Sequence, residues 1–480
     1  MARTGEAYIE ALRTNPPNLW LKGERVEDPT THPAFAGVVR SMAALYDLQH
    51  DPEWRDVLTY PSPSSGRPVG MSFRESRSRD DLEKRSAAYK AWADRTLGLM
   101  GRTPDYLNAA LTAYAQAAAF FAQGDPQFAE NVRRYYEFVR ENDLCTTHAL
   151  TNPQVNRAKS PAEQPDPYIP VGVVRETKEG VIVRGARMLA TLPVADEILV
   201  FPSTVLRSEP GAERYALAFA LPTHTPGLHF VCREPLAGRS AFDHPVSSRF
   251  EEMDAMVIFD DVLVPWERIF ILGSVELTNR AYADTGALHH MAHQVVVHKV
   301  AKTEAFLGLV GLIAEGIGAD RFGHVREKIA EVIVYLEAMR SFWIAAEATG
   351  HENDFGVFVP NRRAIDGARN LYPKLYPRIR EIVQQIGAGG MILLPSERDL
   401  DGPLAAAMAK YMQGRNLDAR RKTQLFRLAW DMTLSGFGAR QELYERFFFG
   451  DPVRMYQTLY EVYDQEPYRD RIRRFLGWEA

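Results

Sequence analysis

One short stretch of the chain, DLCTTHALTNPQVNR at residues 143–157, concentrates side chains that hydrogen bond or titrate. These side chains are Thr146, Thr147, His148, Thr151, Asn152, Gln154, Asn156 and Arg157. Pro153 excludes a helix interior, and the few apolar residues argue against a core strand. So many donors and acceptors must be satisfied by solvent or by a large polar ligand. The composition alone favours a solvated loop, so the binding-site interpretation depends on the rest of the chain.

A second candidate group precedes this stretch. Arg102 and Tyr106 are four residues apart and would share a helix face if the helix began near Arg102. Thr103-Pro104-Asp105 is typical of a helix start, with proline at the first helical position. Spacing alone favours the simpler roles of a capping arginine, a core tyrosine and a structural histidine.

Four histidines, His289, His290, His293 and His298, suggest a metal site at first sight. His289 and His293 are spaced as two ligands on one helix turn. No third ligand follows at motif spacing, and the glutamate of an H-E-x-x-H motif is missing. The sequence therefore predicts no metal. Its two cysteines, Cys145 and Cys232, can form neither a disulfide framework nor a four-cysteine site.

Composition limits the partners. The 480 residues carry a net charge of -5 without a block of like charge, which argues against nucleic acid or an anionic membrane surface as a partner. No apolar run has the length of a membrane span, and the first residues lack the apolar region of a signal peptide. We therefore expect a cytoplasmic protein.

The elements needed to position these residues fall into three blocks. Amphipathic patterns predict helices first, near residues 38–48, 80–99, 104–122 and 128–141. Short β-rich runs follow at 171–174, 180–183, 197–201, 215–221, 228–232 and 255–259. Long apolar helical patterns then cover 293–315, 326–351, 361–386 and 404–425. We predict an α+β protein with a mainly helical domain at 1–143, a β-sandwich or barrel at 144–271 and a helical bundle at 272–480.

The most distinctive motif is FDDVLVPWER at residues 259–268, which resembles the end of the β-domain in acyl-CoA dehydrogenase-like flavoproteins. Their domain order, ending in a four-helix bundle, is the order predicted here. The run Arg102–Tyr106, the polar stretch and RFFFGDP at 446–452 narrow the match. With these features the chain resembles, over essentially its whole length, the large oxygenase components of two-component 4-hydroxyphenylacetate 3-monooxygenases.

This resemblance implies a flavin-dependent monooxygenase. A separate NAD(P)H-flavin reductase would supply reduced FAD, which would react with O2 to form a flavin C4a-hydroperoxide. That species would hydroxylate 4-hydroxyphenylacetate next to its phenol group, giving 3,4-dihydroxyphenylacetate. The lack of a G-x-G-x-x-G fingerprint agrees with electrons arriving from elsewhere. The resemblance also implies a homotetramer built as a dimer of dimers, as do apolar helix faces too extensive for one subunit to bury.

The resemblance also assigns roles to residues. Arg102, Tyr106 and His148 correspond to the catalytic group at the phenol, and Ser203 and Thr204 to the pair near the substrate carboxylate. The flavin contacts carried over are His148, Gln154, Val155, Asn156, Arg157, Thr191, Asp451, Pro452, Val453 and Arg454. Simpler interpretations remain for Thr191 as a strand residue and for Ser203 and Thr204 as a turn. The glycine-rich turn at 385–390 either meets a neighbouring subunit's FAD or ends a helix.

Several alternatives remain to be weighed. A related phenol or chlorophenol monooxygenase would share all of these features. A 4-hydroxybutyryl-CoA dehydratase-like enzyme would need cysteines for an iron–sulfur cluster, and the chain has only two. An acyl-CoA dehydrogenase would need a catalytic carboxylate, for which no candidate stands out. A non-enzymatic scaffold would not require the dense polar stretch beside Arg102 and His148.

Overall fold

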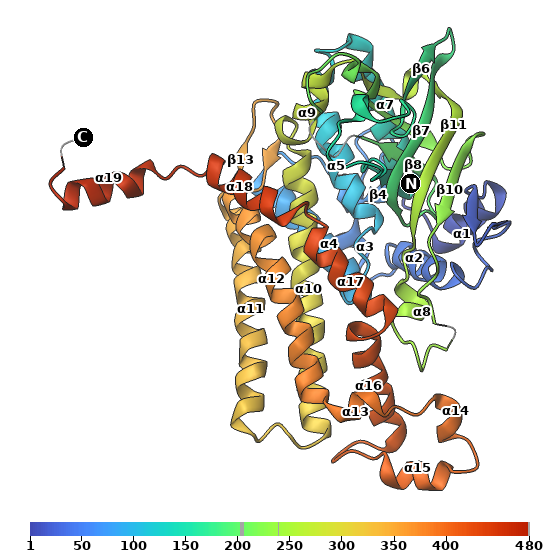
Figure 1. Ribbon diagram of the computed structural model, residues 1–480, viewed down its shortest axis with the longest axis vertical. Helices are drawn as coiled ribbons and strands as arrows, with labels where there is room; N and C mark the ends of the chain where they lie inside the picture. Colours follow the sequence, from blue (N-terminus) through green and yellow to red (C-terminus); the bar gives the residue numbers. More distant parts are fainter. Residues whose placement is uncertain (202–205, 239, 479–480) are drawn as a thin grey trace.

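The protein is described here by a computed structural model that covers residues 1–201, 206–238 and 240–478 (Figure 1). Helices come first, strands dominate the middle of the chain, and long helices follow, so the predicted order of the three blocks is confirmed. No helix of the described ranges combines the length and apolar character needed to cross a membrane.

The N-terminal helices follow the predicted patterns with small shifts at their ends. They are α1 (Gly5–Thr14), α2 (Ala36–Leu48), α3 (Arg55–Leu58), α4 (Arg79–Arg95), α5 (Pro104–Gln116), α6 (Ala118–Phe121) and α7 (Pro126–Asn142). Side chains cap several N-termini, as Ser78 does by accepting a hydrogen bond from the Asp81 backbone. Because α5 begins at Pro104, Arg102 lies before the helix rather than on its face. The predicted helix start at Pro104 is confirmed, and the condition for a shared helix face of Arg102 and Tyr106, a helix beginning near Arg102, is not met.

Two sheets form the middle of the molecule. The six-stranded sheet has the order β2 (Glu24–Arg25), β1 (Leu19–Leu21), β10 (Leu228–Cys232), β11 (Asp254–Pro265), β7 (Gly180–Thr191) and β6 (Gly172–Glu176). The four-stranded sheet has the order β12 (Ile269–Leu272), β9 (Leu217–Pro222), β8 (Glu197–Val200) and β5 (Thr146–Ala149). Strands β1 and β2 come from the first block, so the N-terminal segment also contributes to the larger sheet.

Strand β5 corrects the expectation that the polar stretch contains no core strand. Its four residues are all buried, and it pairs in parallel with β8, with His148 opposite Leu199. Hydrophobic patterning could not identify it, because three of its four buried side chains, those of Thr146, Thr147 and His148, are polar. Backbone pairing needs no particular side chain.

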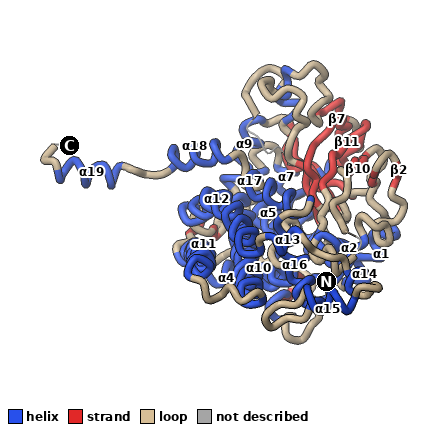
Figure 2. Tube along the Cα trace, turned by 60° about the horizontal axis from the view of Figure 1, so that its bottom comes forward, coloured by secondary structure: helices blue, strands red, loops and turns tan. Residues whose placement is uncertain are grey.

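Three long helices make up the bundle: α10 (Ala287–Gly316), α11 (Gly323–Ala348) and α12 (Arg362–Gly387), seen nearly end-on in Figure 2. The helix expected over 404–425 is wrong, since α15 (Ala405–Tyr411) and α16 (Ala419–Thr433) are separate. A turn closed by a hydrogen bond from Gly414 N to Leu417 O separates them, and Asp418 caps α16. Beyond α17 (Gly436–Phe447), α18 (Pro452–Val462) packs against α12, where the Tyr456 hydroxyl donates to Asn370 O, and α19 (Glu466–Phe475) extends away from the body (Figure 1).

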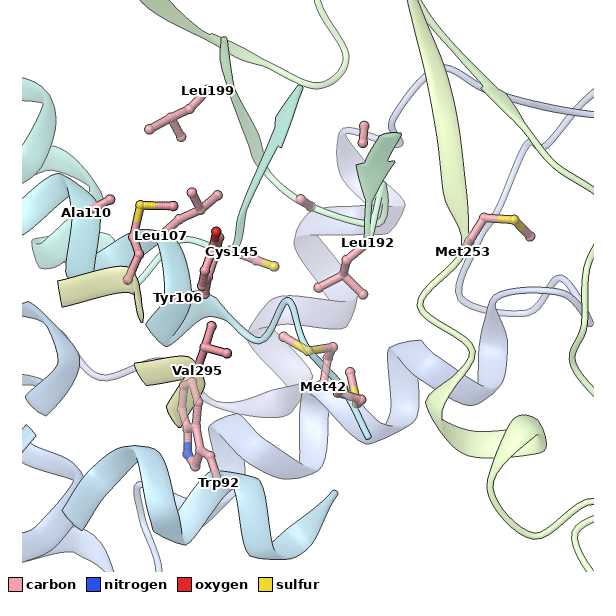
Figure 3. Close-up of a cluster of buried hydrophobic side chains, with 14 of the residues drawn as sticks. Met42, Trp92, Tyr106, Leu107, Ala110, Cys145, Leu192, Leu199, Met253 and Val295 are labelled. Atoms are coloured by element: carbon pink, nitrogen blue, oxygen red, sulfur yellow. The ribbon is translucent and has the colours of Figure 1, made fainter. Parts of the chain in front are cut away.

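One hydrophobic core joins the three blocks. Figure 3 shows side chains from the N-terminal helices, the sheets and α10 meeting in a single cluster. Leu107, Leu199, Met253 and Val295 are each no more than 4% exposed. Burying one such side chain contributes about 1.5–3 kcal/mol. The loops between these elements, including the one that carries Arg102, are therefore held in fixed positions around the core.

Candidate active site

Arg102 lies in a cage of aromatic rings where the three blocks meet. Its guanidinium carbon is 3.9 Å from the centroid of the Phe448 ring and 4.2 Å from that of Tyr106. The guanidinium also donates to the Tyr444 hydroxyl at 3.0 Å. Phe448 and Tyr444 belong to the C-terminal end of α17, more than 300 residues away in the chain. Stacking between rings fixes the plane of the guanidinium and leaves its edge available for hydrogen bonds.

Tyr106 and His148 complete this group. Their ring centroids are 5.6 Å apart, with Tyr106 on α5 and His148 on β5. Burial raises the pKa of the Tyr106 hydroxyl, although Arg102 acts to lower it. Burial lowers the pKa of His148 well below its ordinary value, and Arg102 adds to that effect. The group therefore holds one positive charge, on Arg102, beside a protonated phenol and a neutral imidazole.

The backbone of Arg102 is fixed by a buried carboxylate. Glu252, directly before β11, accepts a hydrogen bond from Arg102 N at 2.6 Å. Burial raises the pKa of Glu252, while the charge of Arg440 acts to lower it. Arg440 in turn donates to Asp254 at 2.6 Å. Burial favours protonation of Asp254, but Arg440 outweighs it, so the pKa of Asp254 is lowered.

Thr191 is tied to the same network. Its hydroxyl donates to Asp254 Oδ1 at 2.7 Å, and its carbonyl accepts from the Thr147 hydroxyl at 2.7 Å. The second bond joins β7 to β5 beside His148. The Thr191 side chain is thus already used within the chain, which leaves its backbone and its hydroxyl lone pairs for any ligand.

Several buried polar atoms around this group lack a partner within the described chain. They are Arg102 Nε, Thr146 Oγ1, His148 Nδ1 and Arg187 Nε. Leaving one such atom unsatisfied costs about 1–3 kcal/mol, and four near one place indicate a ligand that the site is built to receive. A large polar ring system with several donors and acceptors, such as a flavin with a phenol beside it, has the chemistry to satisfy them.

The other predicted flavin contacts lie elsewhere on the surface. Residues 154–157 are exposed in the loop after β5, and residues 451–454 are mostly exposed at the start of α18, where Asp451 caps the helix. Within the described ranges, no hydrogen bond or ion pair joins either segment to Arg102, Tyr106 or His148. The predicted substrate residues Ser203 and Thr204 lie outside the described residues.

Behind the aromatic cage lies a fully buried ionic group. Glu445 Oε1 accepts from Lys299 at 2.7 Å and from Lys302 at 2.5 Å. Burial lowers the pKa of Lys299 to about 7, against the opposing charge of Glu445. Burial acts to raise the pKa of Glu445, but the two lysines outweigh it and the pKa is lowered. Lys299 Nζ is also 5.3 Å from the centroid of the Phe448 ring, so this group supports the cage from the side of α10.

Three histidines of α10 have partners within the protein, whereas the buried Nδ1 of His289 has none among the described residues. His293 Nε2 lies 3.0 Å from Glu347, and His298 Nε2 lies 3.3 Å from Asp105. His290 Nδ1 is 3.3 Å from the Arg85 guanidinium. Among the described residues, no three histidine, cysteine or carboxylate side chains are arranged to hold a metal ion. These three histidines therefore join α10 to α4, α11 and α5.

Sequence reasoning missed several residues of this site. Tyr444, Glu252 and Arg440 are recruited from distant segments, and no local pattern marks them. Arg187 could have been found from the sequence. Side chains alternate between the two faces of a strand, and Arg187 is on the same face of β7 as the buried Val181 and Val183. An arginine on the buried face of a strand is unusual enough to single it out.

The neutral His148 leads to a prediction about pH. Its pKa when folded lies below the unfolded value of about 6.5, so between these two values the unfolded chain binds more protons. The free energy of unfolding should therefore fall as the pH drops below 6.5, by up to about 1.4 kcal/mol per pH unit for this residue. Urea unfolding between pH 7.5 and 5.5 should give a smaller slope for His148→Gln than for the wild type. Equal slopes would contradict a buried neutral imidazole, and His324→Gln, an exposed substitution, is the control.

Comparison with known proteins adds independent information. Residues 4–271 match the family model described as 4-hydroxyphenylacetate 3-hydroxylase N terminal, and residues 278–477 match the corresponding C terminal model. The chain is 69% identical over 477 residues to the 4-hydroxyphenylacetate 3-monooxygenase oxygenase component of Thermus thermophilus, covering 99% of this chain and 98% of the relative. It is 48% identical to the protein of that name from a Geobacillus species, covering 99% and 96%.

A solved structure is similar over the same length. It is the oxygenase component (HpaB) of 4-hydroxyphenylacetate 3-monooxygenase, in a crystal structure complexed with FAD and 4-hydroxyphenylacetate. The TM-score is 0.96 at 68% sequence identity, covering 99% of this chain and 98% of that chain. This chain is therefore similar to that protein in both sequence and fold over nearly its whole length.

Proposed function

Because the chain belongs to the 4-hydroxyphenylacetate 3-hydroxylase family, we propose that it is the oxygenase component of a 4-hydroxyphenylacetate 3-monooxygenase. The observation that carries the proposal is the group of half-buried Arg102 with buried Tyr106 and His148, which has one positive charge and unsatisfied polar atoms. A phenol hydroxylase needs such a group, because attack on the ring is fastest when its oxygen carries negative charge. A related phenol or chlorophenol monooxygenase is the second candidate.

In this proposal the three residues bind the phenol oxygen. Arg102 stabilises the developing phenolate, and the cage of Phe448 and Tyr444 keeps its guanidinium in one plane. Tyr106 donates its hydroxyl hydrogen, since burial keeps it protonated. His148, held neutral, offers one nitrogen as an acceptor and the other as a donor. The three groups together orient the ring so that the carbon next to the phenol meets the oxidant.

Reduced FAD, when bound, supplies the electrophilic oxygen after it takes up O2. We assign its contacts to His148, Gln154, Val155, Asn156, Arg157, Thr191, Asp451, Pro452, Val453 and Arg454. The exposed loop at 154–157 suits a pyrophosphate, because Arg157 can bind it with two hydrogen bonds. The network of Thr191, Asp254 and Arg440 fixes the strand edge expected to meet the flavin ring. A separate NAD(P)H-flavin reductase supplies the reduced cofactor.

We also propose a homotetramer arranged as a dimer of dimers. Helices α10 and α11 border an open groove of about 1020 Å³, lined in part by Leu312 and Ile333. Leu312 is 56% exposed and Val334 on α11 is 64% exposed, more apolar surface than a monomer usually leaves to water. Light scattering should give the mass of four chains, and a stable monomer at working concentration would contradict this assembly.

Two further expectations stay predictions. They are the domain limits 1–143, 144–271 and 272–480, and the cytoplasmic location.

Product analysis tests the proposed activity. The purified protein should convert 4-hydroxyphenylacetate to 3,4-dihydroxyphenylacetate when supplied with reduced FAD and O2. A panel of other 4-substituted phenols, assayed side by side, distinguishes this substrate from a related phenol or chlorophenol. Consumption of O2 without any hydroxylated product from the panel would refute the proposal.

The substrate carboxylate gives a further prediction. We propose that Ser203 and Thr204 donate to it, far from the phenol end. Replacing both by alanine should weaken binding of 4-hydroxyphenylacetate by about 1–3 kcal/mol, because the backbone donors remain. Binding of the neutral 4-methylphenol should change little. The measurement is the ratio of the two dissociation constants, and an unchanged ratio in the double variant would place the carboxylate elsewhere.

A further inference from the structure

Arg187, on the inner face of β7, is a buried cation without a carboxylate partner. Only 1% of its surface is exposed. Its guanidinium donates through one terminal nitrogen to Leu150 O at 3.1 Å and to Asn152 Oδ1 at 2.5 Å. Both of these acceptors are uncharged. Its Nε has no hydrogen-bond partner, and no ion pair involves it, in the part of the chain that the structure describes.

The position of Arg187 connects it to the active site. Leu150, whose carbonyl it binds, follows His148 by two residues, a distance of about 7 Å along an extended chain. Thr191 lies four residues further along the same strand. Burial raises the pKa of Tyr282 on α9 (Val275–Asp284), while the charges of both Arg102 and Arg187 act to lower it. Arg187 therefore lies near the group of Arg102 and His148, bound to the segment that follows β5.

The cost of burying this charge demands an explanation. Arg440 is less enclosed, with 14% of its side chain exposed, and two of its nitrogens donate to the carboxylate of Asp254. Arg187 has no such compensation, and burial lowers its pKa to about 10. A buried charge without a partner is strongly unfavourable, so such residues persist where a ligand supplies the missing charge. An unused Nε beside a free guanidinium edge is the geometry that binds a planar anion with two hydrogen bonds.

We propose that Arg187 is the receptor for an organic anion at the deep end of the active site. This inference rests on the proposed function. The deep position argues against the flavin pyrophosphate, which suits the exposed loop at 154–157, and the phenol end is assigned to Arg102. Two anions of the reaction remain: the negatively charged ring of reduced FAD and the carboxylate of 4-hydroxyphenylacetate. Both present a delocalised charge on planar atoms, and binding measurements can distinguish them.

The alternative is that Arg187 only anchors the chain after β5, through Leu150 and Asn152. Arg187→Gln separates the two roles, because its amide can still donate to the Leu150 carbonyl but carries no charge. Arg184→Gln is the matched control, since Arg184 lies on the same strand, is exposed and pairs with Asp261. The readouts are two ratios of dissociation constants: reduced over oxidised FAD, and 4-hydroxyphenylacetate over 4-methylphenol. Each ratio compares a ligand that carries the anionic group with a counterpart that lacks this negative charge.

In Arg187→Gln, one ratio should rise by about tenfold or more, the loss typical of one hydrogen-bonded charge. A rise in the flavin ratio identifies the reduced ring as the anion, and a rise in the phenol ratio identifies the carboxylate. Arg184→Gln should leave both ratios at the wild-type value. Equal weakening of all four ligands in Arg187→Gln, or no weakening, would overturn the proposal and leave a purely anchoring role.

If Arg187→Gln does not fold, Arg187→Lys serves as the second variant. Lysine keeps the charge but lacks the planar guanidinium. In one of the two pairs of ligands it should therefore weaken binding of the ligand with the anionic group more than binding of its counterpart. Equal effects on both members would overturn the proposal. These outcomes are separate from a failure of the proposed function. Unchanged ratios in a protein that still hydroxylates 4-hydroxyphenylacetate reject only Arg187, whereas a wild type that binds neither flavin nor phenol rejects both.

Discussion

Replacing Arg102 or His148 by alanine is expected to lower the rate of hydroxylation by about 100-fold, while binding of reduced FAD changes far less. Each residue is assigned to the phenol oxygen, and loss of one donor at a developing charge costs about 3 kcal/mol. Arg102 should show the larger effect, because it carries the only charge of the group and stacks between Tyr106 and Phe448. The measurement is the product formed per O2 consumed, together with the affinity for reduced FAD.

Two further variants make this experiment specific. Arg102→Lys keeps the charge but cannot stack as a planar group or bind with a fork, so it should recover only part of the activity. Arg184→Ala removes an exposed arginine from the β-domain and should behave as the wild type. If Arg102→Ala or His148→Ala hydroxylates 4-hydroxyphenylacetate as efficiently as the wild type, the role assigned to that residue is wrong.

Replacing Glu445 by alanine is expected to lower the free energy of unfolding by about 3–5 kcal/mol. Glu445 is fully buried, and its carboxylate is within 2.5 Å of both Lys299 and Lys302. Its removal leaves two buried ammonium groups without a counter-charge, in addition to a cavity. Urea or thermal unfolding measures the change. Glu130→Ala is the control, because its partner Arg134 is exposed and such pairs contribute about 0.5 kcal/mol or less.

The triple variant Lys299→Met, Lys302→Met and Glu445→Leu tests whether the expected loss of stability comes from the unpaired buried charges. It removes the charges together and keeps the volume, so its stability should be close to that of the wild type or higher. A small loss in Glu445→Ala, similar to that of Glu130→Ala, would mean that the lysines are hydrated or neutral in the folded protein. Because Lys299 lies behind Phe448, the triple variant also shows how far the aromatic cage depends on this ionic group.

The sequence alone determined the order of domains and much of the site. Periodicity of apolar residues locates long helices and strands, since each element must bury one face. Pro104 fixed the start of α5, and the motif at 259–268 led to the family. The resemblance to that family then singled out Arg102, Tyr106 and His148 as a group. They meet because a loop, not a helix turn, brings Arg102 over the Tyr106 ring.

Only the tertiary structure decided what surrounds that group. Strand β5 is buried despite its polar sequence, because its backbone pairs with β8 and its side chains line the site. Tyr444 and Phe448 reach Arg102 from the far end of the chain, and Arg187 on β7 binds the segment that follows His148. Local patterns report which face of an element is buried. They do not show which charged side chains lie close together, because the burial, the pKa and the hydrogen-bond partners of each side chain depend on segments that are distant in the sequence.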